Sequence, residues 1–407
     1  MNTALRIRWA SCRCWSTHNI FLPGVKAHVS YIDRPSFLAT YGEWFTHCGL
    51  SEADLDEVVS FAEAEKKRRE QIEVDMLRNK VNNIKQCAST GKDSFILKKD
   101  DFRDEFLALS ELSQSHSVPT EDLLSVVEEV EGLVEVYRFP VLTATCLGRI
   151  NAALDLFEAR MKSKSQPNTM NHSGVLLSEI PGSQAFTDGD SAFDCGGADI
   201  DLMGSLLCQG LQSVLSRLFP DVGRRLDSYR VFTVQYVAPE TAVDNLQDFD
   251  LCSHYDNSEV TVNICLSLSA GDEENVGGDL YFVHRSPNTR GGAVTGEPYA
   301  KLLSHRPGWA VIHRGSHIHG VLPFHHSSVS PFRRSLICWL RSSEQRSTLC
   351  PRCFSSPQLV PMKVLFSGCV VDCTVLSPEE IRSGKFVRAG FADGFEISSV
   401  QKLCSVT

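Results

Sequence analysis

The chain lacks the features that place a protein in a membrane or a secretory pathway. No apolar run approaches the ~20 residues that a helix needs to span a bilayer. Residues 1–25 have no continuous apolar core of the kind that secretory signals carry. We therefore expect a soluble intracellular protein of the cytoplasm or nucleus. Because the segment before Asp33 bears arginines and no acid, a mitochondrial presequence is the alternative.

A basic excess and an ordered cysteine framework are also absent. The net charge of −10 argues against nucleic acid and anionic membranes as partners, because both attract positively charged surfaces. The 15 cysteines are odd in number and scattered, so reduced thiols are the simplest interpretation. The remaining composition, 42% hydrophobic and 22% charged over 407 residues, is typical of a globular protein with two or three domains.

Residues 1–130 are expected to form a mixed, largely helical N-terminal region. Residues 51–54, Ser-Glu-Ala-Asp, match a capping box and predict a helix that runs to about Lys85. Apolar residues at helical spacing predict a second helix from Thr120 to about Glu131. Residues 131–228 are expected to support the core domain with a strand at 134–143, a helix to about 162, a strand at 166–180 and a helix at 202–219.

From residue 229 to 343 the pattern changes to short strands with turn residues between them. These are expected at 228–238, 258–268, 278–284, 300–306, 308–314 and 334–342. Short strands without the helices of a parallel sheet favour an antiparallel sandwich or jelly roll. The fold class is thus α+β, a jelly-roll core with flanking helices, followed by a cysteine-bearing tail at 344–407.

His254 and Asp256 are the first candidates for chemistry, because residues i and i+2 of an extended strand share a face. A second histidine beside them would complete the two-histidine, one-carboxylate triad of non-haem Fe(II) oxygenases. His319 is the preferred third ligand, since the Gly and Pro after it break the strand there. His317, on the same face, is the alternative, and His313 is expected to be a wall residue.

Arg333 and Arg334 begin the last predicted strand of the core. Strand alternation allows only one of the two to face inward. An inward arginine could bind a carboxylate in two hydrogen bonds, because its planar fork matches that group. From alternation alone, either arginine can have this role.

The cysteines of the tail leave two interpretations open. The spacing of four cysteines in the tail is close to that of a zinc ribbon. They are Cys350, Cys353, Cys369 and Cys373. Buried or free thiols are the simpler interpretation. Cys12 and Cys14 could instead complete a site with Cys350 and Cys353.

The chain resembles the Fe(II)/2-oxoglutarate-dependent dioxygenases of the prolyl 4-hydroxylase-like type. The resemblance lies in several long stretches of sequence, among them VYRFPVLTA, RLDSYRVFTVQY, HYDNSEVTVNICL, HRGSHIHGVLP and RRSLICWLR. The resemblance implies a double-stranded β-helix and iron ligation by His254, Asp256 and His319. It implies Arg333 as the ligand of 2-oxoglutarate, because the family's arginine stands six positions before a tryptophan, here Trp339. It also implies that Tyr236 and Asn263 line the cosubstrate site.

The implied reaction consumes O2, converts 2-oxoglutarate to succinate and CO2, and hydroxylates a C–H bond, with L-ascorbate as a possible reductant. A protein prolyl or lysyl side chain is the substrate that the resemblance implies, although a small molecule would serve the same chemistry. Two alternatives remain. One is a non-catalytic interaction module on a jelly-roll scaffold, and the other is a nucleic-acid demethylase with the same cofactors, which rests on the arginines between 305 and 346.

Overall fold

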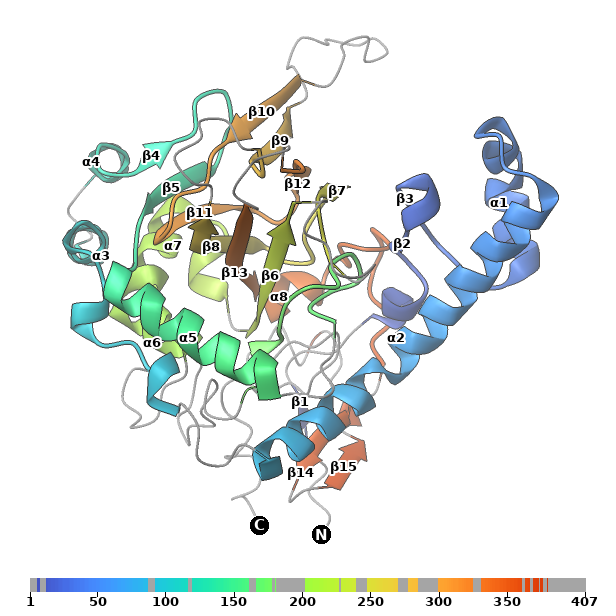
Figure 1. Cartoon of the computed structure of the whole chain (residues 1–407), viewed down its shortest axis with the longest axis horizontal. Coiled ribbons are helices and arrows are strands. Elements are labelled where there is room, and N and C mark those ends of the chain that lie inside the picture. Colours follow the sequence, from blue (N-terminus) through green and yellow to red (C-terminus); the bar gives the residue numbers. More distant parts are fainter. Residues whose placement is uncertain are drawn as a thin grey trace. The chain divides into compact units, whose positions relative to one another are not determined.

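The computed structural model describes residues 6–7, 12–86, 92–115, 119–160, 166–177, 180, 202–226, 228–238, 247–269, 277–284, 299–324, 331–360, 363–366, 369–372, 374–375 and 379. The chain forms two compact units (Figure 1). One comprises Met1–Val81 with Ser343–Thr407, and the other comprises Asn82–Ser342. The finer four-part division expected from the sequence stays a prediction.

The unit Asn82–Ser342 contains two antiparallel sheets. The larger has the strand order β4 (Glu128–Glu129), β5 (Val136–Pro140), β11 (Trp309–Arg314), β8 (Val260–Ser269), β13 (Phe332–Arg341) and β6 (Ser228–Val237). The smaller has the order β10 (Tyr299–Leu303), β9 (Leu280–His284), β12 (His319–Val321) and β7 (Leu251–His254).

Between β6 and β13 the chain passes back and forth between these sheets (Figure 1). Strands β6, β8, β11 and β13 belong to the larger sheet, and β7, β9, β10 and β12 to the smaller. Every pairing among them is antiparallel. This is a double-stranded β-helix, so the α+β jelly-roll fold predicted from the sequence is confirmed.

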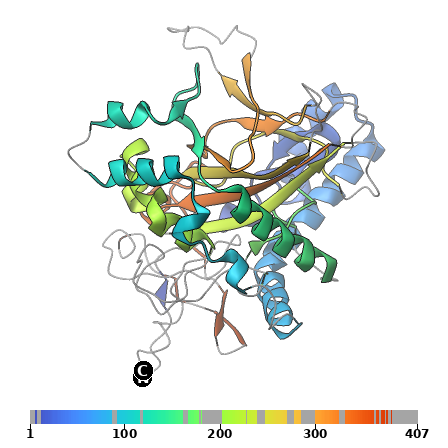
Figure 2. The same ribbon diagram turned by 60° about the vertical axis from the view of Figure 1, so that its left-hand side comes forward.

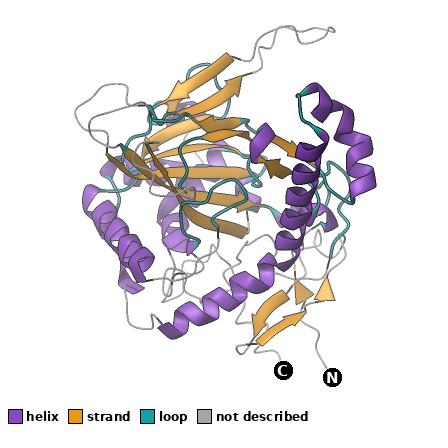
Figure 3. Ribbon diagram, turned by 45° about the vertical axis from the view of Figure 1, so that its right-hand side comes forward, coloured by secondary structure: helices purple, strands orange, loops and turns teal. Residues whose placement is uncertain are grey.

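Helices cover one face of the larger sheet (Figures 2 and 3). They are α3 (Asp104–Gln114), α5 (Ala144–Arg160), α6 (Leu202–Leu206), the π-helix η6 (Leu207–Leu211) and α7 (Gln212–Leu218). Cys146, Ile150 and Leu154 of α5 recur at helical spacing and pack on the strands. Val262 and Ile264 of β8 face these helices, so the alternate residues Thr261 and Asn263 face the interior between the sheets.

The other unit comprises Met1–Val81 and Ser343–Thr407. It contains α1 (Arg34–His47), α2 (Glu52–Gln86, which continues past the unit boundary), α8 (Ser343–Arg346) and three two-stranded pairs: β1 (Arg6–Ile7) with β16 (Thr374–Val375), β2 (Ile20–Leu22) with β3 (Ala27–Val29), and β14 (Lys363–Phe366) with β15 (Cys369–Asp372). The capping box is confirmed, since the Ser51 amide donates to Asp54 at 2.8 Å and the Asp54 amide donates to Ser51 at 3.3 Å. Among the described helices, none is long and apolar enough to cross a membrane.

Two predictions of local structure are wrong. The helix expected from Thr120 to Glu131 stops early, as α4 (Thr120–Leu124), because residues 128–129 pair with β5 instead. No strand spans the described part of 166–180, where only Leu176 forms a bridge, to Phe232. In both places long-range pairing overrides the local pattern. The remaining short elements are the 3₁₀ turns η1 (Arg13–Ser16), η2 (Pro23–Val25), η3 (Lys92–Phe95), η4 (Lys99–Asp101) and η7 (Gly223–Arg225).

Candidate metal centre and cosubstrate site

Strand pairing explains why two histidines that are far apart in the sequence meet. In the register of β12 with β7, His319 lies directly opposite His254. Directly opposed residues on adjacent antiparallel strands project from the same face with their Cβ atoms about 5 Å apart. The two imidazole rings accordingly lie with their centroids 4.4 Å apart.

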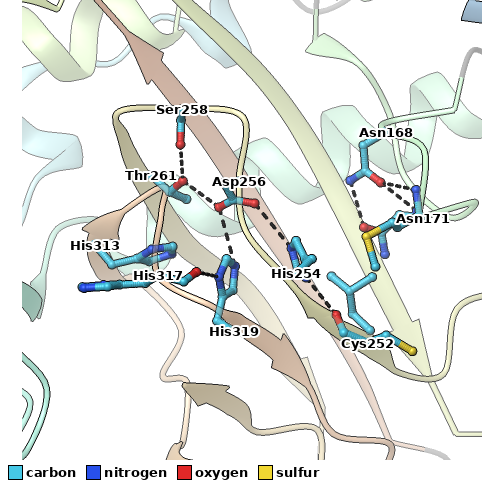
Figure 4. Close-up of polar contacts among 12 residues, drawn as sticks. Asn168, Asn171, Cys252, His254, Asp256, Ser258, Thr261, His313, His317 and His319 are labelled. Carbon is cyan, nitrogen blue, oxygen red and sulfur yellow. Dashed lines mark hydrogen bonds and ion pairs between the residues drawn. The ribbon is translucent and has the colours of Figure 1, made fainter. Parts of the chain in front are cut away.

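Asp256 reaches the same point from the turn after β7. Its Oδ1 lies 3.4 Å from Nε2 of His254, and its Oδ2 lies 3.5 Å from Nε2 of His319. The three side chains point toward one another, with one ligand atom from each within 4.8 Å of the others (Figure 4). Asp256 is 5% exposed and His319 is 7% exposed, so the centre is shielded from water.

The second nitrogen of each ring has its own partner. Nδ1 of His254 is 2.9 Å from the carbonyl of Cys252, and Nδ1 of His319 is 2.9 Å from the carbonyl of His317 (Figure 4). A carbonyl can only accept, so each Nδ1 carries the proton and each Nε2 presents a lone pair to the shared point. This is the tautomer that a metal ligand requires.

The protonation states also suit a cation. Burial lowers the pKa of His319 to about 3, so the ring is neutral at neutral pH. Burial alone would raise the pKa of Asp256, but the positive charge that His319 and His254 carry when they are protonated outweighs burial and holds that pKa below its usual range. Thr261 donates a hydrogen bond of 2.6 Å to Oδ2 of Asp256, and Ser258 lies 2.8 Å from the Thr261 hydroxyl. An ionised carboxylate beside neutral imidazoles is a donor set for a divalent metal.

The other two histidines considered from the sequence stand beside this cluster (Figure 4). His313 is 1% exposed, with its ring centroid 4.5 Å from that of His319 and its Nδ1 2.8 Å from the carbonyl of Arg314. His317 supplies its carbonyl rather than its ring. Neither belongs to the described side chains whose ligand atoms converge, so the geometry favours His319 over His317.

The two neighbouring arginines of β13 have opposite surroundings. Arg334 faces α5, where it pairs with Asp155 at 2.8 Å and Glu158 at 3.2 Å. Arg333 points the other way and is 1% exposed, with its guanidinium 5.2 Å from the ring centre of Tyr236. It donates to the carbonyl of Gly278. Among the described residues, no carboxylate lies within 4.0 Å of Arg333, so no described ion pair neutralises its charge.

Several polar atoms near Arg333 have no hydrogen-bond partner within the described part of the chain. They are Nε of Arg333, Oδ1 of Asn263, Nδ1 of His305 and Oγ of Ser335. Buried donors and acceptors are nearly always satisfied, so these four atoms together indicate a polar ligand or ordered water. The donors of Arg333, which has no ion-pair partner among the described residues, indicate an anionic ligand.

Tyr236 takes part in a hydrogen-bond network on the same side. Its hydroxyl accepts from Nδ2 of Asn171 at 3.1 Å, and that amide also donates to Asp248 at 3.2 Å. Burial raises the pKa of Tyr236, so the phenol keeps its proton, which it can donate to a ligand. The backbone amides of His172 and Ser173 fix Asp248, each at 2.9 Å from Oδ2.

Sequence reasoning did not foresee Thr261, Asn171, Asp248 or His305. His305 donates through Nε2 to the carbonyl of Asn263 at 3.2 Å, and burial together with the charge of Arg333 lowers its pKa to about 3. Of these four residues, only Thr261 could have been found from the sequence. It lies two residues before Asn263 on a predicted strand, so the two share a face. The other three depend on pairings that no local pattern specifies.

A double-stranded β-helix that presents such a donor set beside a buried arginine with no ion-pair partner among the described residues defines an enzyme of the 2-oxoglutarate- and iron-dependent oxygenase class. Comparison with known proteins is consistent with this class. Human 2-oxoglutarate and iron-dependent oxygenase domain-containing protein 2 is 32% identical over 354 residues, which are 86% of this chain and 90% of that protein. The Xenopus tropicalis protein of the same name is 30% identical over 353 residues, covering 86% and 90%. The chain therefore belongs to the family of 2-oxoglutarate and iron-dependent oxygenase domain-containing protein 2.

Two other comparisons add no argument. No protein-family model matches the chain. A Pseudomonas putida prolyl-4-hydroxylase of known structure is 14% identical with a TM-score of 0.32, covering 57% of this chain and 94% of that one. A TM-score this low supports no inference, and the fold assignment rests on the strand order described above.

Proposed function

We propose that His254, Asp256 and His319 hold the catalytic Fe(II) of this oxygenase. The observation that carries the proposal is the convergence of two Nε2 lone pairs and one carboxylate while both Nδ1 atoms are engaged by carbonyls. Three protein ligands on one side of an ion leave its other positions open. The hydrogen bond from Thr261 would orient the carboxylate of Asp256, as hydrogen-bond partners of metal ligands do in metalloenzymes.

Arg333 is proposed to bind the remote carboxylate of 2-oxoglutarate. Its charge is buried without a described counter-ion, and the cosubstrate would supply one. Tyr236 and Asn263 face the same interior and would donate and accept hydrogen bonds at the cosubstrate. The pairing of the Arg334 guanidinium on α5 supports Arg333 over Arg334 for this role.

When bound, Fe(II) supplies the O2-dependent oxidation that turns 2-oxoglutarate into succinate and CO2 and hydroxylates a C–H bond. The residues of the chain position the donors, neutralise the cosubstrate and exclude water from the centre. The proposed substrate is a prolyl or lysyl side chain of a protein, on the strength of the resemblance to the prolyl 4-hydroxylase-like type. L-Ascorbate is proposed as the reductant that restores Fe(II).

Turnover of 2-oxoglutarate tests the proposal without the primary substrate. The purified full chain, supplied with Fe(II), O2 and ascorbate, is expected to form succinate slowly. His254→Ala should abolish both succinate formation and retained iron, whereas Cys48→Ser, an exposed position in the other unit, should change neither. A folded wild-type chain that binds no 2-oxoglutarate in calorimetry would make the protein a non-catalytic module.

The substrate class has its own test. Proteome-derived peptides incubated with wild-type enzyme should gain one oxygen atom on proline or lysine, and peptides incubated with His254→Ala should not. Oxidation confined to nucleic-acid methyl groups, or to small molecules, would refute the protein side chain as substrate.

A further inference from the structure

A second cluster of metal-binding side chains lies in the unit of Met1–Val81 and Ser343–Thr407. Cys12 and Cys14 come from its N-terminal segment, and Cys350 and Cys353 come from its C-terminal part. The four Sγ atoms all lie within 4.8 Å of one another. The Sγ atoms of Cys14 and Cys350 are 3.5 Å apart although the residues are 336 positions apart in the sequence.

These separations fit four sulfurs around one ion. Zinc–sulfur bonds of ~2.3 Å in a tetrahedron place the sulfur atoms ~3.8 Å from one another. A disulfide would require ~2.05 Å, and all four cysteines are free thiols. We propose that Cys12, Cys14, Cys350 and Cys353 bind one structural zinc ion that fastens the N-terminal segment to the C-terminal part of this unit.

The backbone around Cys350 and Cys353 is shaped for this role. The Phe354 amide donates to the Cys350 carbonyl at 2.9 Å, and the Cys350 amide donates to the Ser355 carbonyl at 2.9 Å. Phe354 has φ of 53°, a left-handed conformation that reverses the chain just after Cys353. The turn thus brings both sulfurs of the Cys-Pro-Arg-Cys sequence to one side, as in zinc sites with a C-x2-C spacing.

Hydrogen bonds hold the N-terminal cysteines against this turn. The Arg13 amide donates to the carbonyl of Gln358 at 2.7 Å, and the Gln358 amide donates to Sγ of Cys12 at 3.3 Å. Cys12 also forms an antiparallel bridge with Leu359. Cys14 lies in η1 and is 8% exposed, and Cys350 is 5% exposed. The segment is therefore placed by its backbone, with Cys14 buried and Cys12 partly buried.

Basic side chains accompany the cluster. Four thiolates and Zn²⁺ carry a net charge of −2, which is costly to bury without nearby positive charge. Arg352 donates to the carbonyl of Trp15 at 2.9 Å. Arg69 is 4% exposed and donates to the carbonyls of His18 at 2.8 Å and Asn19 at 3.0 Å. These contacts place two guanidinium groups along the segment that carries Cys14, and one of them, Arg69, is also paired with Glu65 at 2.8 Å.

The chemistry favours zinc and a structural role. Four thiolates in a tetrahedron select zinc or iron among the common metals, and zinc imposes no geometry of its own. All four coordination positions would be filled by protein, which leaves none for a substrate. Among the described residues of this unit the apolar core is small, and a metal stabilises small cores that cannot bury enough apolar surface. The described core consists of Ile20, Leu22, Val29, Tyr31, Phe37, Phe45, Val59 and Ala62.

The zinc content of the full chain tests the proposal. The measurement uses the Asp256→Ala background, so that zinc in the proposed iron centre does not contribute. One zinc per chain should remain after dialysis against a chelator. Cys12→Ser and Cys350→Ser should each reduce it to near zero, whereas Cys48→Ser, an exposed thiol of the same unit, should retain it.

A second test needs no cysteine variant to fold. It is X-ray absorption at the zinc edge, measured on the Asp256→Ala chain with all four cysteines intact. Four sulfur neighbours at about 2.3 Å are expected. Nitrogen or oxygen neighbours, iron in place of zinc, or a Cys14–Cys350 disulfide found by peptide mapping without reductant would each overturn the assignment. So would a zinc content that Cys12→Ser leaves unchanged.

Discussion

Replacing Arg333 by methionine separates binding of the cosubstrate from stability. The guanidinium is 1% exposed and, among the described residues, has no carboxylate within 4.0 Å. In the complex, 2-oxoglutarate would be its ion-pair partner. Removing one member of a buried, hydrogen-bonded charge pair costs roughly 2–5 kcal/mol. At 1.4 kcal/mol for each factor of ten, KM for 2-oxoglutarate should rise about 30-fold or more.

The matched control is Arg334→Met, one residue further along the same strand. Arg334 has three partners on α5, Asp155, Glu158 and Asn151, at 2.8, 3.2 and 3.2 Å. Its loss should lower the melting temperature and leave KM for 2-oxoglutarate unchanged. Arg333→Met should melt close to the wild-type temperature without ligand, because replacing a buried charge by an apolar group is often neutral or stabilising.

The assays are succinate release over a range of 2-oxoglutarate concentrations and thermal unfolding with the cosubstrate and Mn²⁺ under argon. A ligand at 100 times its Kd stabilises a protein by about 2.7 kcal/mol. A 100-fold weaker Kd at the same concentration leaves about 0.4 kcal/mol. The reasoning is refuted if Arg333→Met keeps the wild-type KM, or if Arg334→Met raises it.

Three further outcomes are expected. Thr261→Val removes the hydrogen bond to the carboxylate ligand and should weaken Mn²⁺ binding about 10–100-fold in calorimetry; unchanged affinity would mean that the bond does not orient the ligand. His305 has a pKa lowered from 6.5 to about 3 in the folded chain, so its contribution to stability is present above pH 6.5 and is lost as the pH falls. Urea titrations between about pH 3 and pH 6.5 give the free energy of unfolding as a function of pH. This free energy should rise with pH less steeply for His305→Gln than for the wild type, by ~1.4 kcal/mol per pH unit. Equal slopes would contradict the shifted pKa. Gly278→Ala should cost roughly 1–3 kcal/mol, because Gly278 has φ of +74° and a Cβ there would lie 2.4 Å from the ring of Phe324. It should also raise KM for 2-oxoglutarate, since the Gly278 carbonyl accepts from Arg333, whereas Gly24→Ala, in open space, should do neither.

The jelly-roll fold could be predicted because three strands of the larger sheet, β6, β8 and β13, are long. Val260–Ser269 and Phe332–Arg341 each have 10 residues, and their alternation specifies which side chains face the helices. The same alternation required one of Arg333 and Arg334 to face inward. Which one does so depends on the position of α5, and only the structure provides that.

The short strands β7 and β12 could not be predicted, although they bring the two histidines together. With 4 and 3 residues they carry too little pattern to be recognised. His319 was favoured over His317 only because a Gly and a Pro follow it. The register that places it opposite His254 is a contact between distant parts of the chain, as are the contacts of Tyr236 with Asn171.

The cysteine cluster illustrates the same limit. Spacing along the sequence favours partners that are close in the chain, and it pointed to Cys369 and Cys373 as partners of Cys350. The side chains that approach Cys350 instead come from the opposite end of the sequence, through the pairing of Arg13 and Gln358. Cys373 lies outside the described residues.

The central claim is that His254, Asp256 and His319 would hold one Fe(II) ion beside the site that Arg333 would provide for 2-oxoglutarate. Its most direct test is the visible absorption of the full chain mixed with Fe(II) and 2-oxoglutarate under argon. A broad charge-transfer band is predicted for the wild type and for Cys48→Ser, and no band is predicted for Asp256→Ala. A folded wild-type protein without the band, or an Asp256→Ala protein that retains it, would contradict the account.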